Sequence, residues 1–462
     1  MRTLIRHGTV VTPAGAERAD VLIEGAHVAR VADPIDVEVD RTIDATGRYV
    51  LPGGIDVHTH FDMPYGDTVT ADDFESGTVA AACGGTTCVI DFATQTRRRP
   101  LREALDAWLA KADGKAAIDY GFHVAVCDAG PDLETEMDAL LAEGVTSFKV
   151  FTAYPGRLML DDGAIFRALR RTRENGGTVM VHAENGGAID VLSRAALAEG
   201  RTAPIEHART RPPLAEGEAT HRVVALAELA GAPVYVVHVS AAEAVEEIAR
   251  ARDRGVEAFG ETCPHYLLLT DHLLDQPGLE GAKYVCSPPL RDRRSQERLW
   301  RALAAGELDV VATDHCSFRT DQKAAGKDDF TRIPGGLPGV ETRMSLLFDA
   351  GVRHRRFGIE RFVALTAERP AKLFGLWPRK GAIAPGADAD VLVWDPDREI
   401  TLSAATLHMR ADYSPFEGRV VMGAPEIVLA RGRPVYEGGQ FVGRVGAGSF
   451  VRRAPRTGAV PT

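Results

Sequence analysis

Eight apolar segments of strand length alternate with helical patterns through the middle of the 462-residue chain, and this alternation limits its fold more than any other feature. Short runs rich in β-branched residues, each followed by apolar residues at helical spacing, are typical of β/α units in a parallel sheet. Eight such units favour a closed (β/α)8 TIM barrel over an open sheet. The expected strands span residues 54–57, 87–92, 120–126, 147–151, 179–181, 234–237, 256–261 and 310–313.

The two chain ends are expected to form one small β-sandwich domain. Residues 1–50 contain short β-branched runs separated by turns, and similar runs follow residue 376. Because the N-terminal segment is too short for a core of its own, it needs a partner. We predict the sandwich from residues 1–50 and 376–440, the barrel from 51–375, and an extended tail from 441–462. The tail is expected to be mobile or draped over a partner, with solvated arginines.

Composition narrows the classes of function. A formal net charge of −11 gives no support for nucleic acid or an anionic membrane as the main partner. We read neither a signal peptide nor an uncharged run long enough to span a bilayer. The six cysteines form no CxxC pair and are too sparse for a disulfide framework, which favours reduced thiols in a cytoplasmic protein.

Potential metal ligands stand at the ends of several expected strands. His58 and His60 follow the first strand two residues apart, so their side chains project from one face. A lone HxH pair is as consistent with two ordinary loop histidines. Strand ends of one barrel, however, face a common space. Four imidazoles and a carboxylate suffice for two divalent ions, with Zn²⁺ the best match; the other strand-end residues are Lys149, His182, His238 and Asp314.

Lys149 does not fit a plain dication site, because a charged ammonium next to two cations is repelled. Two alternatives are open. The side chain points away and pairs with a carboxylate, or its neutral amine is carboxylated by CO₂ to a carbamate that bridges the ions. Residue spacing alone does not decide between them.

Nine motifs resemble the dihydropyrimidinase/hydantoinase branch of the amidohydrolases. They are GGIDVHTH, SFKVFTAYPG, VMVHAEN, VYVVHVSA, GETCPHYLLLTD, KYVCSPPLRD, ATDHCSF, PGVETR and DYSPFEG, and the similarity keeps its order to about residue 445. The combination of KVFTAYPG, SPPLR and DYSPFEG separates this branch from more distant amidohydrolases. The resemblance implies a barrel with a β-sandwich, a binuclear zinc centre, a carboxylated lysine and a homotetramer.

The resemblance also assigns roles to single residues. One zinc is implied to be held by His58, His60 and Asp314, the other by His182 and His238, with Lys149 as N6-carboxylysine bridging both. A hydroxide between the ions would attack a ring carbonyl of a small cyclic diamide, a 5,6-dihydropyrimidine or a hydantoin, and give an N-carbamoyl amino acid.

The resemblance implies that four residues serve the substrate, of which Asp314 is also a metal ligand. Asp314 is the expected general base, and Tyr154 the donor to the oxyanion. The backbone of Ser287 is expected to read the imide edge of the ring. Gly335 stands where the family has Asn, so backbone contacts are retained while loop rigidity is reduced.

Other residues near these motifs receive lesser roles. The loop of residues 62–74, with Met63, Pro64, Tyr65 and Phe74, is expected to roof the pocket, and Phe151 and Leu158 to add to its wall. Cys316 is expected to fill space and not to act as a nucleophile. His315 is expected to pack or hydrogen-bond, and His265 and His221 to be structural.

Competing functions share this scaffold. An allantoinase opens a related ring. A dihydroorotase needs a cation for its substrate's carboxylate, and no arginine follows the second histidine in HTHFD. A non-catalytic scaffold similar to the collapsin-response mediator proteins loses metal ligands, whereas all six ligand positions here hold competent residues.

Overall fold

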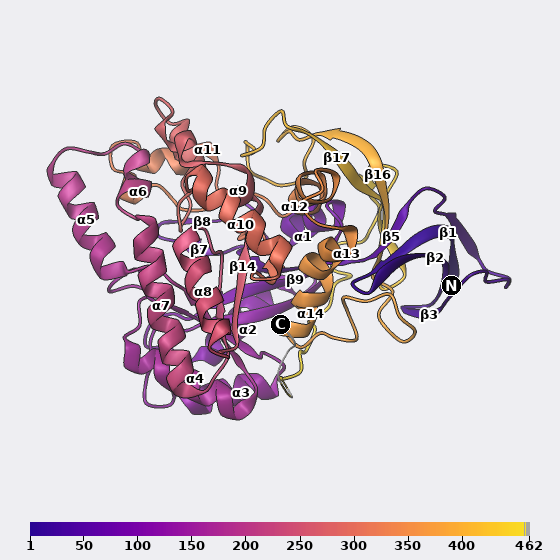
Figure 1. Ribbon diagram of the computed structural model, residues 1–462, viewed down its shortest axis with the longest axis horizontal. Coiled ribbons are helices and arrows are strands. Elements are labelled where there is room, and N and C mark those ends of the chain that lie inside the picture. Colours follow the sequence, from indigo (N-terminus) through magenta and orange to yellow (C-terminus); the bar gives the residue numbers. More distant parts are fainter. Residues whose placement is uncertain (457, 459–462) are drawn as a thin grey trace.

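The computed structural model describes residues 1–456 and 458. Within them, the eight expected strands form one parallel eight-stranded sheet that follows chain order. This confirms the predicted barrel, which occupies the left-hand part of Figure 1. Its strands are β6 (Gly54–Thr59), β9 (Thr86–Thr94), β10 (Asp119–Ala125), β11 (Ser147–Phe151), β12 (Thr178–His182), β13 (Val234–Val236), β14 (Ala258–Thr262) and β15 (Val310–Val311).

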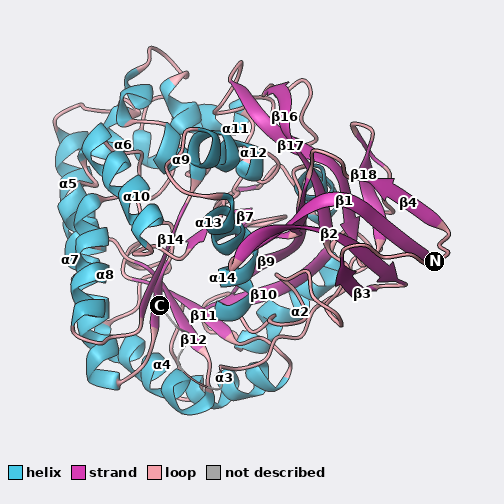
Figure 2. Ribbon diagram, turned by 45° about the vertical axis from the view of Figure 1, so that its right-hand side comes forward, coloured by secondary structure: helices cyan, strands magenta, loops and turns pink. Residues whose placement is uncertain are grey.

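Helices cover the outside of the barrel (Figures 1 and 2). Local sequence defines their ends. In α4, Asp161 accepts a hydrogen bond from the Ala164 N–H at 2.8 Å, and Gly176 ends the helix at a φ of 77°. The helices are α1 (Phe74–Cys83), α2 (Leu101–Ala112), α3 (Leu133–Ala142), α4 (Asp162–Asn175), α5 (Gly186–Ala198), α6 (Ile205–Arg209), α7 (Pro213–Ala230), α8 (Ala242–Asp253), α9 (Pro264–Leu268), α10 (Arg293–Ala305), α11 (Thr320–Lys323), α12 (Arg343–Leu347), α13 (Ile359–Val363) and α14 (Arg369–Leu373).

The barrel closes next to the predicted metal ligands. The segment after β15 runs beside the end of β6. There the His60 N–H donates to the His315 carbonyl at 2.8 Å, and the His315 N–H donates to the His58 carbonyl at 3.3 Å. The backbone that closes the barrel therefore also brings the HxH pair next to Asp314.

Strands from both chain ends form a sheet-rich terminal domain, at the right of Figure 1, where the sequence predicts a small β-sandwich. Among the described residues they share one nine-stranded sheet, in which β5 pairs with β1 on one side and β16 on the other. The strands are β1 (Arg2–Thr12), β2 (Gly15–Glu24), β3 (His27–Ala32), β4 (Arg41–Asp44), β5 (Tyr49–Pro52), β16 (Val391–Thr401), β17 (Val420–Ala430), β18 (Arg433–Glu437) and β19 (Gln440–Phe441). The exact domain boundaries stay a prediction.

The C-terminal tail packs against the barrel of its own chain. The Val451 N–H donates to the Tyr120 carbonyl at 2.7 Å, and Val451 is buried. Arg453 is also buried and donates to Ser147 Oγ at 2.9 Å. The expectation that the tail is mobile is therefore wrong for this part, and the prediction of solvated arginines is wrong for Arg453. Residues 457 and 459–462 of the predicted tail lie outside the described part.

Two composition-based expectations can be compared with the structure. All six cysteines are free thiols, and all are buried. In the described part of the chain, no helix is long and apolar enough to cross a bilayer.

Candidate active site

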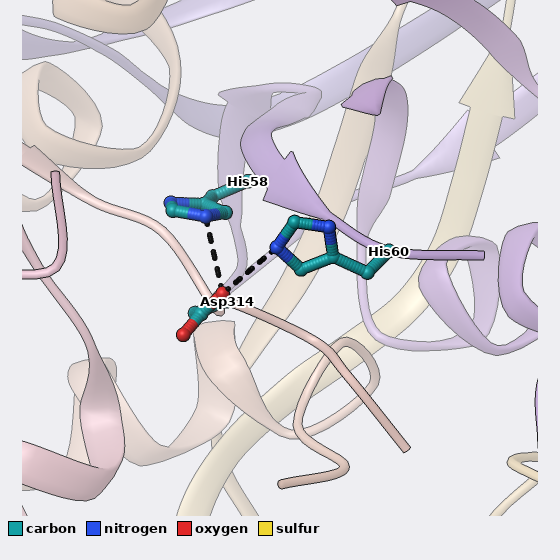
Figure 3. A group of neighbouring side chains, drawn as sticks. All are labelled: His58, His60 and Asp314. Carbon is teal, nitrogen blue, oxygen red and sulfur yellow. Dashed lines mark hydrogen bonds and ion pairs between the residues drawn. The ribbon is translucent and has the colours of Figure 1, made fainter. Parts of the chain in front are cut away.

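Three predicted ligands meet where β6 and β15 end (Figure 3). Asp314 Oδ1 lies 3.1 Å from His58 Nε2 and 3.1 Å from His60 Nε2. One ligand atom from each residue falls within 4.8 Å of the other two. Burial alone would raise the pKa of Asp314, but the imidazoles of His58, His60 and His238 together outweigh burial and hold that pKa well below its usual range. The carboxylate is thus in the ionised form that binds a cation.

The other two histidines form a second group beside the first. His182 Nδ1 lies 2.9 Å from His238 Nε2, and the rings of His58 and His238 are 5.4 Å apart. Burial lowers the pKa of His182 and of His238. Their imidazoles are therefore neutral near pH 7, which is the form that coordinates metals.

Lys149 lies between the two groups and does not turn away. Its Nζ is 3.0 Å from His58 Nε2 and 4.3 Å from the centre of the Phe92 ring. Among the described residues, no carboxylate lies within ion-pair distance of its Nζ. Lys149 therefore does not form the carboxylate pair that the first alternative requires. Burial lowers the pKa of Lys149, which favours the neutral amine.

Two glutamates orient the imidazoles of His58 and His182, each by contacting the ring nitrogen that faces away from the cluster. Glu184 accepts from His182 Nε2 at 2.8 Å, so Nδ1 of that ring faces its partner His238. Glu261 contacts His58 Nδ1, so Nε2 of that ring faces Asp314 and Lys149. Burial would raise the pKa of Glu184, but Arg211, 2.8 Å away, lowers it to about 2.

The residues present fit a pair of borderline-soft divalent cations. The atoms that face one another are imidazole nitrogens and one carboxylate oxygen, the donor set that zinc prefers. Nδ1 of His60 and Nδ1 of His238 are buried and have no hydrogen-bond partner among the described residues. Neutral imidazoles crowded at hydrogen-bond distance are better satisfied by a cation than by one another.

A cavity of about 160 Å³ opens directly above these groups. The cavity is lined by the three residues predicted to contact the substrate, Tyr154, Ser287 and Gly335. Five of the six predicted ligands also line it. The sixth, His58, is fully buried and is not among the lining residues. Met63, Pro64 and Tyr65 of the predicted roof also line it, as do Phe151 and Leu158. Phe74 does not, because it begins α1 and packs 5.6 Å from the Phe61 ring.

Three residues of this site have a strained backbone conformation. Tyr154, His238 and Asp314 have φ angles of 65°, 40° and 49°, in the left-handed region that side chains other than glycine rarely adopt. Such conformations persist where the surrounding structure holds them, and they cluster at functional sites. Spacing in the sequence carries no sign of this strain.

The remaining predicted residues have the modest roles expected of them. His315 Nε2 lies 3.1 Å from Asp72, and its Nδ1 accepts from Gly339. Burial raises the pKa of the Cys316 thiol, which keeps it protonated. His265 is buried against Tyr266, and His221 pairs with Glu247 on the surface.

Glu184 and Glu261 were not singled out from the sequence. Glu261 does end the seventh expected strand, so the strand-end criterion that found the ligands also applies to it. Glu184 stands two residues after His182, a spacing typical of a carboxylate that orients a metal-binding imidazole.

Comparison with known proteins places this geometry in a family. The amidohydrolase family model matches residues 49–435. A D-hydantoinase of Streptomyces coelicolor is 54% identical over 98% of both chains. Among solved structures, a dihydropyrimidinase from Brevibacillus agri has a TM-score of 0.98 at 50% identity, covering 100% of both chains. An L-hydantoinase from Arthrobacter aurescens has a TM-score of 0.90 at 31% identity, covering 98% of this chain and 99% of its own.

A (β/α)8 barrel with a cluster of potential metal ligands at its strand ends defines a barrel enzyme in which the chemistry occurs where the strands end. The chain belongs to the amidohydrolase family, and within it to the hydantoinase/dihydropyrimidinase branch. The resemblance predicted from the motifs is confirmed, and the chain is an enzyme that hydrolyses cyclic amides. A non-catalytic scaffold is not supported, since all six predicted ligand positions hold residues able to bind a metal, and five of these residues line the cavity.

Proposed function

We propose that the chain hydrolyses a ring amide bond of 5,6-dihydropyrimidines or hydantoins and releases N-carbamoyl amino acids, with two Zn²⁺ per subunit. The observation that carries the proposal is the convergence of Lys149 with four imidazoles and Asp314 under a single cavity. The names of the relatives, D-hydantoinase and dihydropyrimidinase, support the ring class.

His58, His60 and Asp314 would hold one ion, and His182 and His238 the other. The Lys149 amine would add to CO₂ and lose a proton, giving a carbamate whose two oxygens reach both groups. Its place beside His58, without a carboxylate partner in the described chain, supports this modification. The ions, when bound, lower the pKa of a water enough to supply hydroxide near neutral pH and polarise the ring carbonyl.

The chain's own residues then position the ring and move a proton. Asp314, ionised in this structure, accepts the proton of the attacking water and delivers it to the departing ring nitrogen. Burial raises the pKa of the Tyr154 phenol, so it keeps its proton and donates to the developing oxyanion. The backbones of Ser287 and Gly335 face the same cavity and would hold the imide edge of the ring.

The relatives also suggest the handedness of the substrate. Four D-hydantoinases are 46–54% identical to this chain and one from Thermus sp. is 40% identical, whereas the L-hydantoinase compared above is 31% identical. We therefore propose D-selective opening of 5-substituted hydantoins, with Met63, Phe151 and Leu158 against the substituent. A homotetrameric state and a cytoplasmic location are further proposals that rest on the family resemblance, and sedimentation of the purified enzyme tests the first.

Metal analysis paired with a substrate panel tests the function. We expect two zinc ions per subunit and turnover of dihydrouracil and D-5-substituted hydantoins, with L-enantiomers and allantoin at least tenfold slower. The Asp314→Asn variant should keep much of its metal but lose turnover by about 10²-fold or more, because the proton acceptor is gone. Turnover of allantoin alone, or wild-type rates in Asp314→Asn, would contradict the proposal.

A further inference from the structure

Lys323 is a fully buried lysine at the end of α11 whose ammonium bonds only to backbone carbonyls in the described structure. Nζ donates to the carbonyls of Val285 at 2.9 Å, Pro334 at 2.6 Å and Gly336 at 2.9 Å. Across residues 1–456 and 458, no carboxylate forms an ion pair with it, and its side chain does not line the cavity. Its three donors are therefore fully used in joining chain segments.

The three carbonyls belong to the two segments that carry the proposed ring contacts. Val285 lies two residues before Ser287, while Pro334 and Gly336 flank Gly335. The Gly336 N–H also donates to the Val285 carbonyl at 3.0 Å, which adds a direct hydrogen bond between the two segments. Lys323 thus joins the Ser287 segment to the Gly335 segment directly behind the cavity wall.

The Gly335 segment needs such a restraint. Two adjacent glycines leave the backbone a wide range of conformations. Gly336 has a φ of 152°, and a Cβ there would lie 2.4 Å from the Cys316 carbonyl oxygen, so this position must remain glycine. Rigidity has to come from outside the segment, and hydrogen bonds from a charged donor are among the stronger ones available.

The arrangement is costly for the fold. An ammonium ion buried without a carboxylate loses its hydration, and three carbonyl groups replace it only in part. Burial lowers the pKa of Lys323 to about 7. An apolar side chain of similar length would avoid the cost of the buried charge but would leave the Pro334 and Gly336 carbonyls without their donor. The gain in stability from the lysine is therefore small, and its specific product is the fixed spacing of the two segments.

We propose that Lys323 is a positioning residue for substrate recognition, which sets the spacing and direction of the Ser287 and Gly335 backbones that hold the imide edge of the ring. This inference rests on the proposed function of those two segments. Lys323 acts through them and does not touch the substrate, so its loss should weaken ring binding while the metal ligands stay in place.

The test compares Lys323→Met with wild type. Lys323→Met keeps the length of the side chain but removes all three donors. We expect unchanged metal content and a KM for dihydrouracil raised roughly tenfold, the equivalent of one hydrogen bond, with a smaller change in kcat. Lys283→Met is the matched control, because Lys283 is partly exposed, pairs with Glu280 and lies just before Val285 in the chain.

A KM within twofold of wild type in Lys323→Met would overturn the inference, and so would a fall in unfolding temperature with KM unchanged. If Lys323→Met does not accumulate, Lys323→Ala is purified with ethylammonium and the amine is then diluted out. A rising KM in a protein that stays folded and metal-loaded supports the inference, whereas unfolding at constant KM overturns it. If wild type itself turns over no cyclic diamide, the proposed function fails instead, and the two failures are distinct.

Discussion

Lys149 shows most clearly how one residue can define the chemistry of a site. Its Nζ lies among imidazoles, 3.0 Å from His58 Nε2. An unmodified lysine there would repel two cations, whereas a carbamate would bind both. The proposed modification would therefore make the six predicted ligands compatible with one another.

The Lys149→Ala variant should lose activity by about 10³-fold or more, because it removes the proposed bridge between the ions. Metal content is expected to fall as well. Short carboxylic acids such as acetate or propionate should restore part of the rate, since their two oxygens can occupy the space of the carbamate. Steady-state rates with and without the acid check this, and untreated Lys149→Ala with wild-type activity would exclude a bridging role.

Two neighbouring glycines near the cavity should respond differently to alanine. A Cβ at Gly335 would lie 3.5 Å from Ser287 Oγ, an ordinary contact, whereas at Gly336 it would lie 2.4 Å from the Cys316 carbonyl oxygen. We expect Gly335→Ala to change the free energy of unfolding by less than about 0.5 kcal/mol. Gly336→Ala should cost about 2 kcal/mol or more, because of backbone strain and overlap. Urea denaturation of the pair measures both, and equal losses would contradict the assigned geometry.

The sequence predicted that the six candidate ligands would lie together, because strand ends of a barrel converge whatever the loops between them do; their roles as ligands stay a prediction. It did not reveal which nitrogen of each imidazole faces the cavity. That choice depends on Glu184 and Glu261, whose partners are identified only once the strands are placed. Nor did spacing indicate the strained backbone at Tyr154, since left-handed φ angles outside glycine leave no compositional trace.

At the scale of elements, the eight strands could be predicted because each is a short apolar run with β-branched residues. The short helix α11 has no such pattern, and its function follows from its place. It brings Lys323 to carbonyls of two other segments, and backbone carbonyls are the same in every residue. A contact of this kind can be found only from coordinates.

Because Lys323 is buried, it makes the free energy of unfolding depend on pH. In the folded protein its pKa is lowered to about 7, while in the unfolded chain it stays near the ordinary lysine pKa of 10.5. Between these values the unfolded state binds more protons, so Lys323 makes stability rise with pH across this window. The cost of the buried charge is fully present below pH 7.

Lys323→Met should remove that pH dependence. The unfolding free energy of the variant minus that of wild type should be highest at about pH 6.5 and should fall as pH rises towards 10, by at most about 1.4 kcal/mol per pH unit. Urea unfolding at several pH values, with Lys283→Met as the control, measures the difference. A difference that is constant across this range would show that Lys323 is not desolvated as the structure has it.

At the scale of the whole molecule, the tail joins the starts of several barrel strands. Its backbone bonds to Tyr120, Gly144 and Gly176, which lie at or just before the N-terminal ends of β10, β11 and β12. The metal ligands lie at the opposite ends of the strands. The sequence did not predict this packing, because a stretch rich in Gly, Arg and Pro has neither helical nor strand periodicity.

Ending the chain at Gly448 should therefore lower stability and leave catalysis intact. The truncation exposes the contacts of Val451, about 1.5–3 kcal/mol of apolar burial, and removes backbone hydrogen bonds worth about 1 kcal/mol each. We expect a loss of about 5 kcal/mol or more in unfolding free energy and a KM within twofold of the full chain. A chain ending at Arg456 keeps all these contacts and is the control. Should the shorter truncation unfold like the control, the tail does not stabilise the barrel; should its KM rise tenfold, the two ends of the barrel are coupled and the tail acts on the cavity as well.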